Sequence, residues 1–199
     1  MKSISINPFV AALFVTIALP LAARQDPPKL PDPGPGPTMA ETKAWLESDG
    51  VAFMSGATEL IQFPGSSILT VMTKEEQNLK LENCSLTWVG HITTKTTVPG
   101  KPDEIDNSVT TYEMPMKDVD VAGVQVVPRG PANDPSGFNV NVPIRAALGP
   151  TITYKSSRDN EPKKQAGAGF EVRTEADGGR IAAAIKRAAI LCGAPKGSF

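Results

Sequence analysis

The chain has one histidine, two cysteines and no excess of basic residues, and each shortage narrows the chemistry open to it. Of its 199 residues, 20 are Lys or Arg and 21 are Asp or Glu, which gives a formal net charge of −1. This balance lacks the positive charge that drives binding to nucleic acid or anionic membranes. Because His91 is the sole histidine, a zinc site built from several histidines is excluded. We predict no metal and no cofactor.

No nucleophile with an attendant base is evident in the sequence. A G-x-S-x-G elbow is absent, so a Ser-His-Asp or Cys-His arrangement would have to use His91. His91 falls on the outward side of a threonine-rich strand pattern, where a solvated histidine is expected. We therefore predict no catalytic residue.

The carboxylates form no recognisable motif. Asp118 and Asp120 lack the glycine and the further oxygen ligands of a calcium loop. Asp103, Glu104 and Asp106 share one loop and indicate solvated charge. A glycosidase could still draw two carboxylates from distant positions, so a small secreted hydrolase stays an alternative.

The N-terminus has the layout of a secretory signal peptide. A basic start at Lys2 precedes an apolar run from Pro8 to Leu19, and small residues follow at Ala22 and Ala23. We predict a signal peptide over residues 1–23, cleaved after Ala23. An uncleaved membrane anchor is the alternative, and no later segment is long and apolar enough to span a bilayer. The predicted location is secreted or periplasmic.

Residues 24–37 contain the proline-rich run DPPKLPDPGPGP. Such a run has few backbone donors and favours polyproline II, so we interpret it as a semi-rigid linker. A ligand for a proline-recognising domain is the alternative.

Residues 38–77 are predicted to hold a short helix and accessory strands. Thr38 and Glu41 form a capping box for a helix over 38–50, and Gly50 is a plausible end. TELIQF and SSILTVM are typical of strands around a Pro64-Gly65 turn.

Residues 78–199 are predicted to form a β-domain closed by a helix. Alternating apolar residues indicate seven strands, with a hairpin between the first two at Glu82-Asn83. The strands are expected at 78–83, 84–92, 108–114, 123–127, 137–144, 151–155 and 169–175.

The closing stretch, residues 177–195, is an amphipathic helix. Asp177 is placed as its cap and Gly193 just past its end. Its apolar stripe consists of Ile181, Ile185, Ala188 and Cys192. A membrane-active tail is disfavoured by the few basic residues, and an anion site at Gly178-Gly179 by the charge of Asp177.

This order of strands and helix, from NLKLENCSLTW to RIAAAIKRAAILCG, resembles the pleckstrin-homology-like fold. It also resembles small exported bacterial proteins of that shape without an assigned activity. The resemblance implies a bent seven-strand sheet or barrel (mainly β with a capping helix, α+β) whose open end the helix plugs. It further implies a scaffold that binds peptides or proteins and seldom catalyses, without lipid-headgroup binding, because the first hairpin loop is short and acidic.

Two cysteines in an exported chain suggest one disulfide. Cys84 and Cys192 both fall on the apolar face of their elements, and a helix that plugs the barrel would bring them together. We predict a Cys84–Cys192 bridge, with two buried free thiols as the alternative.

Taken together, these patterns favour an exported, non-catalytic binding or interaction module with an unknown protein or peptide partner. A secreted hydrolase using carboxylates and a structural envelope protein are the alternatives.

Overall fold

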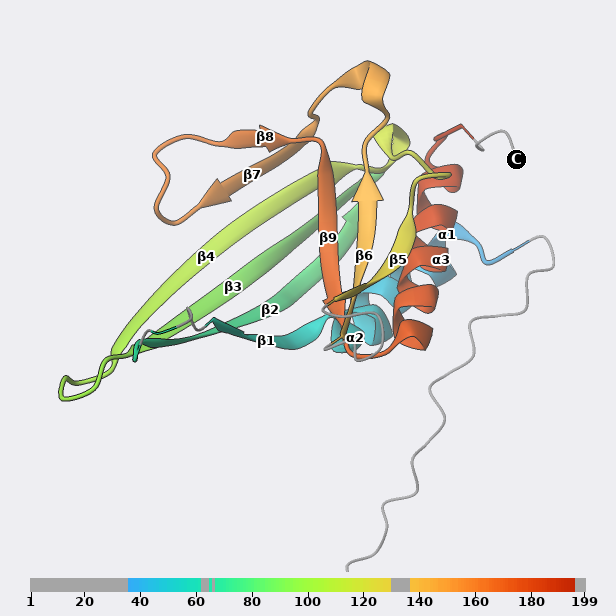
Figure 1. Ribbon diagram of the computed structural model, residues 1–199. Coiled ribbons are helices and arrows are strands. Elements are labelled where there is room, and N and C mark those ends of the chain that lie inside the picture. Colours follow the sequence, from blue (N-terminus) through green and yellow to red (C-terminus); the bar gives the residue numbers. More distant parts are fainter. Residues whose placement is uncertain (1–35, 62–64, 66, 130–136, 196–199) are drawn as a thin grey trace, which may run out of the picture.

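The computed structural model describes residues 36–61, 65, 67–129 and 137–195, which form two antiparallel sheets and a C-terminal helix (Figure 1). The prediction of a mainly β chain with a short N-terminal and a longer C-terminal helix is confirmed. The predicted signal peptide, and the linker up to residue 35, lie outside the described residues.

The larger sheet has the strand order β1-β2-β3-β4-β7-β8, and the smaller sheet has the order β5-β6-β9. The strands of the larger sheet are β1 (Ser55–Ile61), β2 (Leu69–Glu82), β3 (Ser85–Thr97), β4 (Glu104–Pro115), β7 (Ile152–Ser156) and β8 (Lys163–Gln165). The strands of the smaller sheet are β5 (Gln125–Arg129), β6 (Gly137–Pro143) and β9 (Gly167–Val172). The helices are α1 (Met39–Trp45), α2 (Val51–Phe53) and α3 (Glu175–Leu191), with a π-helical turn at Leu46–Gly50 and 3₁₀ turns at Met116–Asp118 and Ala146–Leu148.

The first helix begins as the sequence predicts and ends later. Thr38 caps α1 in a capping box with Glu41. The predicted end at Gly50 is wrong, because Gly50 has helical backbone angles and the chain continues through a π-helical turn into α2. Gly50 is buried within this helical segment, and a Cβ atom there would lie 3.4 Å from the Trp45 ring.

Strand β2 is longer than predicted. It runs through residues 77 and 78, where the sequence suggests a break, and its register with β3 shifts between Gln77 and Lys80. Asn78 has φ 53° at this irregularity, which is a backbone conformation that asparagine tolerates better than most residues. The hairpin to β3 follows directly after Glu82, as predicted.

The pairing of the strands differs from the single bent sheet that the resemblance implies. The fourth predicted strand, residues 123–127, lies partly in β5, which pairs with β6 in the smaller sheet. After Pro115 the chain enters a 3₁₀ turn and leaves the larger sheet, and β7 takes the place beside β4 by pairing Tyr154 with Tyr112. The expected single seven-strand sheet or barrel is therefore not found: the described strands form two separate sheets and no closed barrel.

Helix α3 covers the smaller sheet, with α1 on its other side (Figure 1). The N-terminal cap of α3 is Thr174 rather than the predicted Asp177. Thr174 lies before the first helical turn, and its hydroxyl accepts a hydrogen bond of 3.1 Å from the backbone N–H of Asp177. Gly193 follows the helix with φ 87°, as a C-terminal glycine should. Gly178 lets the helix approach the sheet, since a Cβ atom there would lie 2.7 Å from Cγ1 of Val126.

The core lies between the inner face of β2, β3 and β4, the smaller sheet and α3. Trp88 on β3 is buried and contacts Phe170 on β9, with 5.0 Å between ring centroids. The fully or almost fully buried members include Leu86, Met114, Val140, Phe170, Ile181 and Ile185. Beyond this core, β2, β3 and β4 extend at one end well past the smaller sheet (Figure 1).

Candidate functional site

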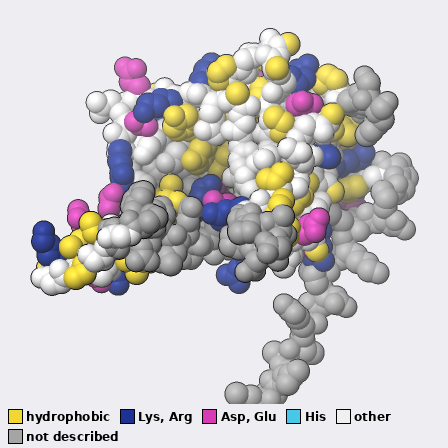
Figure 2. Space-filling model, viewed as in Figure 1, with side chains coloured by type: hydrophobic (Ala, Val, Ile, Leu, Met, Phe, Trp, Pro, Cys, Tyr) yellow, Lys and Arg dark blue, Asp and Glu magenta, His cyan; other side chains and the backbone are white. Residues whose placement is uncertain are grey.

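A cleft of about 310 Å³ lies where the side of β9 that pairs with no strand among the described residues faces the inner surface of the larger sheet. We call it the junction cleft. Its lining residues are Lys74, Glu76, Trp88, Tyr112, Asn139, Gln165, Gly167, Ala168, Gly169 and Glu171. On the face shown in Figure 2, charged side chains of both signs lie among hydrophobic ones near the centre of the molecule.

Glu76 is the most unusual residue of the junction cleft. Its side chain is only 2% exposed, and Lys74 lies 2.7 Å away, from Nζ to Oε1. The residue opposite on β3 is Gly90, and a Cβ atom at that position would lie 3.2 Å from Oε2 of Glu76. The glycine therefore leaves the space that the carboxylate occupies.

The environment of Glu76 favours its neutral form. Burial raises the pKa of Glu76, and the nearby charge of Lys74 offsets this only in part. Glu171 adds to the increase and His91 opposes it. Tyr112, which is half-buried beside this group, also has a raised pKa, chiefly because of burial.

A second carboxylate, Glu171, lines the same cleft from β9. It accepts a hydrogen bond of 2.6 Å from Nη1 of Arg129 on β5, and both side chains are about one-fifth exposed. Arg129 is not among the lining residues of the cleft. The cleft itself is thus lined by two carboxylates and one ammonium group.

The backbone of β9 contributes to the cleft through its unpaired side. Ile144 donates its N–H to the carbonyl of Ala166 at 2.8 Å, and β9 continues this antiparallel ladder with Ala168 opposite Val142 and Phe170 opposite Val140. Bonded and non-bonded pairs alternate in such a ladder. The N–H and C=O groups of the intervening residues, Gly167, Gly169 and Glu171, therefore point away from β6.

The pairing of Pro143 supports this assignment. Pro143 lies opposite Gly167. The carbonyl of Pro143 points away from β9 and accepts a hydrogen bond of 2.9 Å from the backbone N–H of Asp120. In the part of the chain that the structure describes, β9 is the edge of its sheet. Strand β1 contacts β9 and begins beside the C-terminal end of β9 (Figure 1), so the glycine-containing end is the more open part of the edge.

A groove of about 430 Å³ continues from the junction cleft over the outer face of the smaller sheet. The two hollows share Asn139 and Gly167–Gly169. Asn139 donates to the side-chain oxygen of Asn141 at 2.5 Å, so two amides lie beside glycines that carry no side chain. This arrangement leaves the β9 backbone accessible next to hydrogen-bonding side chains.

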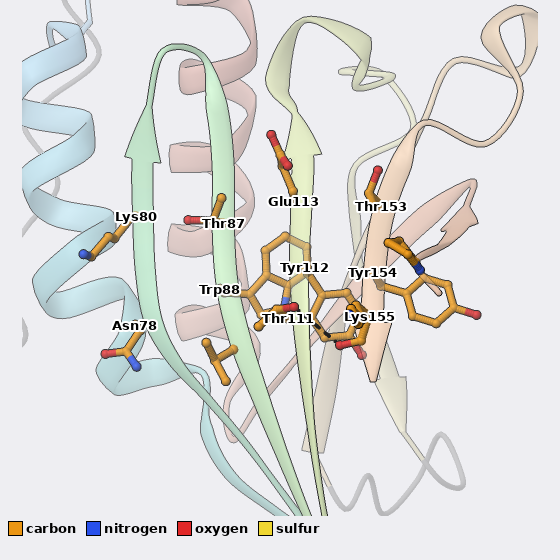
Figure 3. A pocket seen from close by; sticks show the side chains of 12 residues that line it. Asn78, Lys80, Thr87, Trp88, Thr111, Tyr112, Glu113, Thr153, Tyr154 and Lys155 are labelled. Atoms are coloured by element: carbon orange, nitrogen blue, oxygen red, sulfur yellow. Dashed lines mark hydrogen bonds between the residues drawn. The ribbon is translucent and has the colours of Figure 1, made fainter. Parts of the chain in front are cut away.

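A wider hollow of about 700 Å³ lies on the outer face of the larger sheet, shown in Figure 3. There Lys80, Thr87, Glu113 and Thr153 come from the neighbouring strands β2, β3, β4 and β7. These side chains are exposed or half-buried. With no charged side chain buried on this surface, we place the candidate site in the junction cleft.

The residues considered in the sequence analysis lie elsewhere. His91 is half-buried on the outer face of β3, opposite Glu75 and Val109. Asp103 pairs with Lys95 at 2.6 Å, and Asp106 pairs with Arg158. Asp118 and Asp120 lie beside the turn after β4. Among the described residues, no group of three or more His, Cys, Asp or Glu is arranged to hold a metal ion.

Sequence reasoning did not single out Glu76 or Glu171. A signal for Glu76 is present in retrospect: Lys74 and Glu76 occupy two successive inward positions of β2, where apolar residues are expected, and a glycine stands opposite the second.

Cys84 and Cys192 join the β2–β3 hairpin to the end of α3. Their sulfur atoms lie 2.18 Å apart and their Cα atoms 5.5 Å apart. This is the geometry that the predicted disulfide requires. Cys84 has φ 59°, so the tight turn itself presents the cysteine to the helix.

Comparison with known proteins gives no relative: the chain matches no protein-family model, no curated protein and no solved structure. The resemblance to the pleckstrin-homology-like fold stays a prediction.

Proposed function

We propose that the protein is an exported, non-catalytic binding module that holds an extended segment of another polypeptide as a strand added to the free edge of β9. The observation that carries this proposal is the direction of the backbone groups of Gly167, Gly169 and Glu171, which point into the junction cleft. An unpaired strand edge is a template for pairing with another chain, and such pairing is a recurring mode of peptide recognition.

The composition of β9 suits an added strand. Gly167 and Gly169 carry no side chains, so a second backbone can come close without displacing anything on their face. Gly167 to Glu171 spans five residues, which corresponds to about 14–17 Å of extended chain. The expected ligand is therefore a short extended segment.

The disulfide and the predicted signal peptide support an exported protein. The paired cysteines suit an oxidising compartment. No helix within the described residues is long and apolar enough to cross a membrane. Arg187 on α3 donates to the Pro37 carbonyl at 2.7 Å, which fixes the end of the proline-rich linker to the domain. The pleckstrin-homology-like resemblance points to the same class of peptide-binding scaffold.

Two substitutions at one position test strand addition. Gly169→Ala and Gly169→Pro both place a Cβ atom about 3.0 Å from the Asn139 side chain, but only proline removes the N–H that faces the cleft. The probe is a blocked heptapeptide, Ac-Thr-Val-Thr-Lys-Thr-Val-Thr-NH₂, labelled for fluorescence anisotropy. We expect the alanine variant to bind it and the proline variant to lose most binding, whereas equal binding by both variants, or by neither, would contradict the proposal.

A carboxylate-dependent hydrolase is the second candidate. It is favoured by one observation: Glu76 and Glu171 line one cleft, and burial raises the pKa of Glu76, as for a general acid. Incubation with a panel of chromogenic glycosides separates the two functions. Turnover by the wild type that disappears in Glu76→Gln would favour the hydrolase, while the binding module predicts no turnover by either protein.

A further inference from the structure

We propose that Tyr112 and Tyr154 form a site of oxidative modification, at which a one-electron oxidant joins the two phenol rings into a dityrosine cross-link. The cross-link would tie β7 to β4 within one chain. This inference is independent of strand addition at β9.

Tyr112 and Tyr154 are the two tyrosines of the chain, and the fold brings them together. They lie directly opposite each other on the neighbouring strands β4 and β7, so their side chains share one face of the larger sheet. Their ring centroids lie 6.1 Å apart, and the ring planes are inclined by 27°. The two phenols are therefore neighbours without any rearrangement of the backbone.

The two tyrosines continue a row of aromatic side chains (Figure 3). Trp88 on β3 stacks on Tyr112, with 4.8 Å between ring centroids and 6° between ring planes. Tyr112 lies between Trp88 and Tyr154, because β4 lies between β3 and β7. Trp88 is 3% exposed, whereas both tyrosines are half-buried. An oxidant in solution therefore reaches the row through its tyrosines.

The cross-linking reaction removes two electrons and two protons from the pair. Each phenol loses one electron and its hydroxyl proton, which leaves a phenoxyl radical. The two radicals couple through a C–C bond between an ortho carbon, Cε, of each ring. The hydrogen on each coupled carbon then leaves as a proton, and each oxygen regains one. Hydrogen peroxide, used by a haem peroxidase, accepts the two electrons and two protons and becomes two water molecules.

Proximity decides which radicals couple. Within one folded chain the second ring lies 6.1 Å from the first, whereas the tyrosines of other molecules are far away in a dilute solution. Groups held together react as if at a concentration far above that of free partners. Because both side chains are partly exposed, they also keep room for the rotation that the new bond requires. We therefore expect a cross-link within the chain rather than between chains.

The cysteines of the chain do not compete with this reaction. A free thiol would reduce a phenoxyl radical before it could couple. The chain has two cysteines, and both are joined in the Cys84–Cys192 disulfide. The same oxidising compartment that suits the disulfide also suits a tyrosine cross-link.

Treatment of the full chain, with its disulfide intact, with a haem peroxidase and hydrogen peroxide tests the proposal. At micromolar protein concentration we expect a monomer that has lost two hydrogen atoms and shows the blue fluorescence of dityrosine. Mass spectrometry after proteolysis should find the peptides that contain Tyr112 and Tyr154 joined. Tyr112→Phe and Tyr154→Phe each keep an aromatic ring at the position and should each abolish the cross-link within the chain.

A matched control keeps two tyrosines and moves one of them to the other face of the sheet. In the double variant Tyr154→Phe, Thr153→Tyr, the new tyrosine lies opposite Glu113 on the outer face, so the sheet separates it from Tyr112. The yield of cross-link within the chain should fall about tenfold, because proximity is lost. An equal yield in this control would overturn the proposal. Dityrosine formed only between chains, or none under conditions that couple N-acetyltyrosine amide, would overturn it as well.

Discussion

Glu76→Gln is expected to remove a pH-dependent loss of stability from the folded protein. The substitution keeps the shape of the side chain and removes its ionisation. In the wild type, burial of a 2% exposed carboxylate raises its pKa above the ordinary value that it has in the unfolded chain. Folding therefore favours the protonated form of this residue.

The sign of the effect follows from proton binding. Between the ordinary pKa and the raised pKa of Glu76, the folded state binds more protons than the unfolded state, so stability decreases as the pH rises. Each tenfold difference in proton affinity between the two states is worth about 1.4 kcal/mol. Incompletely compensated burial of a polar group costs about 1–3 kcal/mol, and we expect the wild type to lose that amount relative to Glu76→Gln between pH 4 and pH 8.

Urea unfolding, followed by tryptophan fluorescence with the disulfide intact, measures the difference at each pH. His91 is present in both proteins, so the comparison centres on position 76. Glu75→Gln is the control and should follow the wild-type pH dependence, since Glu75 is exposed. A stability difference between wild type and Glu76→Gln that stays constant with pH, or grows in the opposite direction, would refute the described burial of Glu76.

Three further predictions concern the disulfide, helix α3 and the N-terminus. Cys192→Ser should lower the free energy of unfolding by up to about 4–5 kcal/mol, because the bridge to Cys84 closes a loop with a sequence separation of 108 residues. Mass spectrometry of the unreduced wild-type protein should find no free thiol. Gly178→Ala should destabilise the protein by about 1–3 kcal/mol, because the added methyl group would clash with β5. Gly179→Ala should stabilise it by up to about 1 kcal/mol, because the added atom meets nothing within 4 Å and alanine favours the helix. Thermal unfolding measures both effects. N-terminal sequencing of exported protein should begin at Arg24, and a chain that keeps Met1 in the membrane fraction would contradict cleavage.

Local sequence patterns predicted the positions of the helices and strands better than they predicted which strands pair with one another. The alternation around Leu86 and Trp88 places β3 and its buried face, and Thr38 with Glu41 marks the start of α1. The partner of GVQVV is not encoded locally, because the 3₁₀ turn after Pro115 decides which sheet receives it.

The candidate site depends on contacts between distant parts of the chain. Glu76 stands in the polar stretch TKEEQ, which is typical of an exposed strand, and it is buried because Gly90 leaves room and β9 closes over it. Gly167 and Gly169 become an open edge only because the chain leaves the larger sheet after β8 and continues in the smaller one as β9. Neither event leaves a periodic signal in the sequence.

Amide hydrogen exchange along β9, measured by NMR with and without the lysine heptapeptide, tests strand addition most directly. Gly167, Gly169 and Glu171 direct their N–H groups into the cleft, while Ala168 and Phe170 direct theirs to β6. The account predicts that the peptide slows exchange at the first three residues and leaves the other two nearly unchanged. Protection that does not alternate along β9, or no change at Gly167 and Gly169 at saturating peptide, would contradict it.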